Sequence, residues 1–269
     1  MYLTHVYKTM IKTEIPSSDS TNFTVREMIS TDPASPLLFI LPAMGAKARY
    51  YEPFGQQLNA QGYHVVIPDW RGNGDFPEKP SRQHNFGYKE LLLDLNQVVN
   101  FYKHKFPDRK MIIAGHSLGG QLGSLFTAQY PDQIDALILI AACSIYYKGW
   151  DGFGRVKVLL AANVFPLIAN LFGYFPGDKF QFAGREAQTV IHDWSATIRT
   201  GKYQPIGSTF DYEPALNRLR KKILAFSIEN DDLATVKAVH NLLAKFNPQS
   251  EIKQDRKSTR LNSSHDQIS

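Results

Sequence analysis

Short apolar runs alternate regularly with longer stretches of helical periodicity, and this alternation leaves few architectures open. Residues 37–41, 64–67, 111–114 and 136–141 are runs of the kind found in strands buried on both faces of a sheet. Between them, apolar residues recur at helical spacing, most clearly from 86 to 106. Because strands separated by helices pair in parallel, we predict an α/β fold, a mostly parallel sheet flanked by helices.

The alternation pauses between residues 143 and 212, where aromatic and glycine-rich segments of helical character take its place. It resumes with a strand-like run at 223–227 and a helical stretch at 235–246. The intervening segment therefore interrupts one domain and does not follow it. We expect a core made of residues 1–142 and 213–254, with residues 143–212 inserted as a lid above the sheet.

The most apolar window of this insertion runs from Val156 to Phe175. It contains Lys157, Asn163 and Pro166, which would be costly in the hydrocarbon of a bilayer. We therefore expect a buried or pocket-lining helix here, and no stable membrane insertion.

Charge and cysteine content narrow the range of partners. The chain has 30 Lys and Arg against 25 Asp and Glu, a formal net charge of +5, with the two signs interspersed. That distribution is a weak argument for nucleic acid, so we expect no nucleic acid partner. Cys143 is the single cysteine and cannot form an intrachain disulfide, and the first residues do not resemble a secretory signal. The expected location is cytoplasmic.

Residues 115–119, Gly-His-Ser-Leu-Gly, match the pattern G-x-S-x-G, and Gly120 adds another small residue. The match lies where a predicted strand ends and a predicted helix begins. A tight turn there requires small neighbours and lifts the serine hydroxyl above the sheet. The helix N-terminus also points backbone N–H groups towards an anion formed there. We predict that Ser117 is a nucleophile; the structural alternative is a plain strand-to-helix turn.

The motif around Ser117 is one of seven segments that resemble a known family. These segments are LPAMG (41–45), DWRGNG (69–74), FGY (86–88), GHSLGG (115–120), GYFPG (173–177), FAGRE (182–186) and DWSATIRTG (193–201). Through these segments residues 20–254 resemble the α/β-hydrolase superfamily, closest to a poorly characterised bacterial branch of predicted serine hydrolases. The resemblance implies the α/β-hydrolase fold and a serine hydrolase that uses no cofactor and no metal. Its small-molecule substrate would be an ester, thioester or amide of a small or apolar acyl group.

In that superfamily an acid in the loop after a late strand orients a catalytic histidine. The matching loop here contains Asp231 and Asp232, and the spacing to Thr235 favours Asp231. Both carboxylates could instead be ordinary loop or helix-capping groups.

The resemblance also implies an oxyanion hole that combines the backbone N–H of Leu118 with one from the loop after the first central strand. Many relatives carry His-Gly in that loop, whereas this chain has Pro42 and Ala43, so Met44 is the matching donor. The function survives the change because the donor is a backbone group. Met44 could alternatively be a wall of the substrate pocket.

The histidine of the superfamily follows the last strand, which would begin here at about residue 251. Residues 255–269 are polar, lack periodicity, and resemble the forward translation of a sequencing adapter. We therefore expect a non-native tail from residue 255, a truncated C-terminal strand and helix, and a catalytic histidine beyond the truncation. The other histidines, including His116 beside the nucleophile, are poor substitutes as a base. This truncated form of the hydrolase is expected to be inactive or nearly so.

A second hypothesis is a non-catalytic α/β-hydrolase-fold protein that binds an apolar ligand in the lid pocket. The intact turn around Ser117 favours the enzyme, because a binding protein has no need of an exposed serine.

Overall fold

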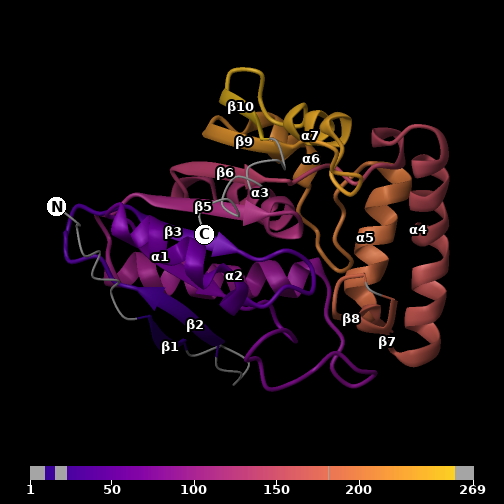
Figure 1. Ribbon diagram of the computed structural model, residues 1–269, viewed down its shortest axis with the longest axis horizontal. Helices are drawn as coiled ribbons and strands as arrows, with labels where there is room; N and C mark the ends of the chain where they lie inside the picture. Colours follow the sequence, from indigo (N-terminus) through magenta and orange to yellow (C-terminus); the bar gives the residue numbers. More distant parts are fainter. Residues whose placement is uncertain (1–9, 16–22, 181, 258–269) are drawn as a thin grey trace, which may run out of the picture.

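The computed structural model describes residues 10–15, 23–180 and 182–257. Eight strands form one sheet in the order β1-β2-β4-β3-β5-β6-β9-β10 (Figure 1). The pairs β1–β2 and β2–β4 are antiparallel and all other neighbours are parallel. The strands are β1 (Ile11–Ile15), β2 (Phe23–Met28), β3 (Leu37–Leu41), β4 (His64–Pro68), β5 (Met111–His116), β6 (Ala136–Ile140), β9 (Lys222–Ile228) and β10 (Glu251–Lys257).

Helices cover both faces of the sheet, which explains why the central strands are continuously apolar. Along β3, Leu37, Phe39 and Leu41 pack in the core on the side of α2 and α3, whereas Leu38 and Ile40 pack in a second core beside α1. The helices outside the insertion are α1 (Glu52–Ala60), α2 (Tyr88–Lys105), α3 (Leu118–Gln129), α6 (Tyr212–Arg218) and α7 (Val236–Leu243), with 3₁₀ turns η1 (Ala48–Tyr51) and η2 (Pro131–Gln133). Two further 3₁₀ turns, η3 (Tyr147–Gly149) and η4 (Gly177–Phe180), lie within the insertion.

This architecture confirms the predicted α/β fold, and most element bounds lie within two residues of those expected. The main difference is β10, which was expected to be cut short near Gln254 and instead runs to Lys257. It pairs in parallel with β9 over its whole length, with Asp255 opposite Phe226 and Lys257 opposite Ile228. The strand lies at the edge of the sheet and is mostly exposed, so its residues carry no apolar pattern that periodicity could detect.

Between β6 and α6 the chain forms a separate layer beside the sheet, at the right of Figure 1. We call residues 143–212 the cap. In it α4 (Gly152–Phe172) packs along α5 (Gln188–Thr200). The hairpin of β7 (Tyr174–Pro176) and β8 (Arg185–Ala187) lies at one end of the pair.

Helix α4 is more exposed than the sequence led us to expect, because the cap is a thin layer and none of the described residues covers the outer face of α4. Only Ala162, Pro166 and Ala169 are buried in it. The exposed large apolar side chains of α4 are Phe153, Val156, Leu160, Val164, Leu167, Leu171 and Phe172. Among the described residues, α4 is the one helix that is long and apolar enough to cross a bilayer. An 18-residue window of this helix has a mean hydropathy of 1.5, and 11% of the window is buried. The prediction of a buried or pocket-lining helix was therefore wrong for the outer face of α4, whereas Val158, Ala161 and Phe165 on its other side line a cavity.

Candidate active site

Ser117 occupies a sharp turn between β5 and α3. Its backbone has φ 51° and ψ −115°, a combination that non-glycine residues rarely adopt. The flanking glycines are required by close packing: a Cβ atom on Gly119 would lie 2.2 Å from the carbonyl oxygen of Leu41, and one on Gly115 would lie 2.4 Å from the nitrogen of Gly120. The G-x-S-x-G pattern is thus explained by the space available around a strained serine.

Two backbone N–H groups beside this turn are unused. Among the described residues, no hydrogen bond involves the N–H of Met44 or that of Leu118. Both residues line the cavity that Ser117 also lines. Leu118 is the first residue of α3, so its N–H lies at the positive end of the helix dipole. The two predicted oxyanion donors are therefore close to the serine and free to donate.

The loop that carries Met44 is held at several points. The indole Nε1 of Trp70 donates to the carbonyl oxygen of Pro42 at 2.8 Å. The N–H of Ala43 donates to the Tyr51 hydroxyl at 2.9 Å, and this hydroxyl lies 2.8 Å from Nδ1 of His116. Tyr51 therefore links the loop to the residue that precedes Ser117.

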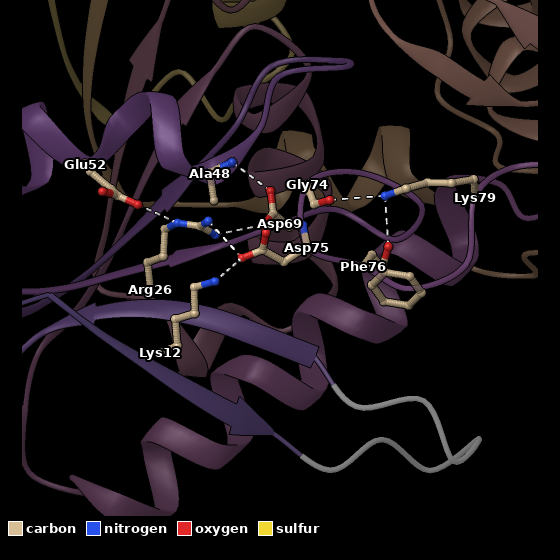
Figure 2. A network of polar contacts seen from close by, with 9 residues as sticks. All are labelled: Lys12, Arg26, Ala48, Glu52, Asp69, Gly74, Asp75, Phe76 and Lys79. Carbon is tan, nitrogen blue, oxygen red and sulfur yellow. Dashed lines mark hydrogen bonds and ion pairs between the residues drawn. The ribbon is translucent and has the colours of Figure 1, made fainter.

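A buried ion network, shown in Figure 2, holds the far end of the same loop. Asp69 accepts a hydrogen bond from the N–H of Ala48 at 2.7 Å through Oδ1, and from the Arg26 guanidinium at 2.9 Å through Oδ2. Arg26 also donates to Glu52 at 2.6 Å and to Asp75 at 2.9 Å. Arg26 was not among the residues predicted from the sequence. The sequence did contain a signal, because two charged residues are adjacent in a predicted strand. Successive side chains of a strand point to opposite faces, so one of the two must be buried against the sheet.

The cavity between the sheet and the cap has a volume of about 430 Å³. Its wall brings together all four predicted site residues: Met44, Ser117, Leu118 and Asp231. Most of the remaining wall is apolar and comes from both layers: Ala141, Cys143, Ile145, Trp150, Val158, Ala161, Phe165, Phe182, Trp194 and Ile198. The cavity is large enough for a small organic ligand.

Asp231 and Asp232 both line this cavity, but their contacts differ. Asp231 Oδ1 accepts hydrogen bonds from the N–H groups of Leu233 at 2.8 Å and Ala234 at 3.0 Å. The carbonyl oxygen of Asp232 accepts from Trp150 Nε1 at 2.8 Å. Asp231 is thus fixed in a turn at the cavity wall, while the backbone of Asp232 anchors the cap.

Electrostatics connect Asp231 to the serine turn. Burial lowers the pKa of the His116 imidazole, and the charge of Asp231 opposes this shift. Burial, with a smaller contribution from Asp231, raises the pKa of the Cys143 thiol to about 12, so this thiol stays protonated at neutral pH. Cys143 is therefore a wall of the cavity and not a nucleophile.

The described histidines do not complete a triad. His116 is the one described histidine that lines the cavity, and its Nδ1 is occupied by Tyr51. His64 is paired with Glu27, and His192 lies 2.8 Å from Asn170. No hydrogen bond joins a described histidine to Ser117 or Asp231. Within the same residues, no group of three His, Cys, Asp or Glu side chains could hold a metal ion.

Comparison with known proteins gives the family and the fold. The family model described as serine aminopeptidase, S33, matches residues 32–193, more than half of the chain. An uncharacterised protein of Mycobacterium tuberculosis is 28% identical over 110 residues, 40% of this chain and 30% of that protein. A monoacylglycerol lipase of Mycolicibacterium smegmatis is 28% identical over 131 residues, 49% of this chain and 45% of the lipase. The matches thus span less than half the length of these curated relatives.

Among solved structures, a thermostable carboxyl esterase of Bacillus coagulans aligns with a TM-score of 0.68 at 11% identity, covering 93% of this chain and 90% of the esterase. At that identity the likeness shows the fold alone. Fold and family model nevertheless point to one group of proteins, and the chain belongs to the serine aminopeptidase S33 family within the α/β-hydrolase superfamily.

Proposed function

We propose that this protein is a serine hydrolase in which the Ser117 hydroxyl attacks the carbonyl carbon of an ester, thioester or amide. The observation that carries the proposal is the strained turn that presents Ser117 to a cavity beside two unused backbone N–H groups. Met44 and Leu118 donate to the oxyanion as the carbonyl becomes tetrahedral. Collapse expels the alcohol, thiol or amine and leaves an acyl group on Ser117, which water then removes.

Asp231 is proposed as the acid that orients the catalytic histidine. The position of its carboxylate at the cavity wall and its influence on the pKa of His116 support this role. The base takes the Ser117 proton and passes it to the leaving group. We propose that this base is a histidine of the natural sequence beyond residue 254, since His116 is held by Tyr51.

The cap is proposed to act as a lid that selects small or apolar acyl groups. Both α4 and α5 contribute apolar side chains to the cavity, namely Val158, Phe165, Trp194 and Ile198. An apolar wall binds an apolar chain by removing it from water. No cofactor takes part in this proposal, and Cys143 as a buried free thiol fits the cytoplasmic location that we propose.

Covalent labelling with a fluorophosphonate tests the role of Ser117. Label should appear on the natural protein, be absent from Ser117→Ala, and persist in Ser124→Ala, whose hydroxyl is buried on the same helix and donates to the carbonyl oxygen of Gly120. Label that does not depend on Ser117 would reject the nucleophile and favour the hypothesis of a non-catalytic binding protein.

A rate comparison tests the proposed base. A general base contributes about 100- to 10,000-fold to rate. The chain extended by its natural sequence beyond residue 254 should therefore hydrolyse p-nitrophenyl butyrate at least about 100 times faster than the 269-residue chain, in which β10 is intact. Equal rates would reject a base in the natural sequence beyond residue 254.

A further inference from the structure

One polar side chain of the cavity has no part in the proposed reaction. Gln121 lies on α3, four residues after Ser117, and lines the same cavity. It is 2% exposed, and its Oε1 atom has no hydrogen-bond partner among the described residues. Buried side-chain oxygens are nearly always paired, so an unpaired one on a side chain that lines a cavity indicates a partner supplied by a ligand.

The surroundings of Gln121 limit what that partner is. Apart from Lys157, which is exposed and lies over the Phe153 ring, the residues of α4 and α5 that line the cavity are apolar. The protonated thiol of Cys143 is only a weak donor. A charged ligand group buried there would need a counter-charge, which a neutral amide does not provide. A neutral hydroxyl satisfies the amide, because it both donates and accepts and so pairs with either end of the side chain.

The position of Gln121 also indicates which part of the substrate carries the hydroxyl. Four residues along a helix span about 6 Å, a reach of a few bonds from a carbonyl carbon held at Ser117. The leaving group must depart while the acyl group stays on Ser117, so the acyl chain occupies the buried wall. We propose that Gln121 binds a hydroxyl group on the acyl chain, and that the enzyme prefers hydroxyacyl substrates. This inference rests on the proposed function, because it needs the carbonyl at Ser117.

Ligand binding tests the inference without requiring hydrolysis. Trp150 and Trp194 line the cavity, so their fluorescence reports occupancy. In a Ser117→Ala background, ethyl 3-hydroxyhexanoate should bind at least about five times more tightly than ethyl hexanoate. A ratio of this size is what one additional hydrogen bond to a buried group contributes to affinity. The variants Gln121→Leu and Gln121→Met should abolish this preference by weakening the hydroxy ester and strengthening the plain ester.

Matched controls separate this role from a structural one. Ser124→Ala removes a polar group from the same helix away from the cavity wall and should retain the fivefold preference. A third ligand, 2-hydroxyethyl hexanoate, carries its hydroxyl on the alcohol part and should bind like the plain ester. Equal binding of the first two esters, or a gain confined to the third, overturns the inference. So does a preference that survives both Gln121 variants.

The two proposals fail in different ways. If the natural protein hydrolyses both esters through Ser117 without preference, the hydroxyl inference is wrong and the hydrolase stands. If the hydroxy ester binds preferentially through Gln121 but no Ser117-dependent turnover or label is found, the hydrolase proposal is wrong.

Discussion

Replacing Arg26 with methionine would measure how strongly the buried network of Figure 2 stabilises the fold. Arg26 is 4% exposed, and its guanidinium donates to Glu52, Asp69 and Asp75 at 2.6, 2.9 and 2.9 Å. Methionine retains most of the aliphatic packing but leaves the Asp69 carboxylate, 3% exposed, without its counter-charge. Removing one partner of a buried ion pair costs about 3–5 kcal/mol, so we expect a loss of that size in the free energy of unfolding.

Lys12→Met is the matched control, because Lys12 and Arg26 bind the same carboxylate. The Lys12 ammonium lies 2.9 Å from Asp75, with the two side chains 54% and 36% exposed. A surface pair of this kind contributes about 0–1 kcal/mol. The two variants therefore compare a buried and an exposed cation in one network.

Urea denaturation followed by tryptophan fluorescence gives the free energy of unfolding of each variant. Equal slopes of this free energy against urea concentration show that the variants unfold alike. Adding Asp69→Asn to the Arg26 variant should recover part of the loss, because an amide can still accept the hydrogen bond from Ala48 without leaving a buried charge. If Arg26→Met costs no more than Lys12→Met, burial does not determine the strength of this network and our reasoning is wrong.

Three further predictions concern single residues. Burial raises the pKa of Glu186 to about 8 from an ordinary 4.5, so between these values the folded protein holds a proton that the unfolded chain releases. Stability should therefore fall as pH rises from 4.5 to 8. In Glu186→Gln the melting temperature should depend less on pH over this range, and a variant with the same pH dependence as the parent would contradict the role of Glu186. Gly119→Ala would place Cβ 2.2 Å from the carbonyl oxygen of Leu41. We therefore expect the free energy of unfolding, measured in urea, to fall by about 1–3 kcal/mol and the labelling of Ser117 to become slower. A variant that is as stable and as fully labelled as the parent would refute the packing argument. Tyr51→Phe removes the hydroxyl that holds Ala43 at 2.9 Å, and should lower kcat for p-nitrophenyl butyrate about tenfold with little change in KM. A rise in KM at unchanged kcat would instead assign Tyr51 to substrate binding.

The elements and the serine turn could be predicted because their signals are local. Strand β3 is marked by five consecutive apolar residues, and α2 by apolar positions at helical spacing. The turn at Ser117 needs glycines at fixed positions on either side, so five adjacent residues are enough to predict it. Resemblance to the superfamily then added Met44 and Asp231, which the structure places on the same cavity wall.

The sequence by itself determined the order of strands and helices, the α/β class and the position of the candidate nucleophile. Only the tertiary structure decided that Arg26 pairs with Asp69, 43 positions away, and that the outer face of α4 is exposed. It also decided that Gln121 is buried with an oxygen that no described residue pairs. Local patterns record the preferences of neighbouring residues for helix or strand. Burial and pairing depend on which distant segments meet, and the cost of an unpaired polar group exists only after those segments have excluded water.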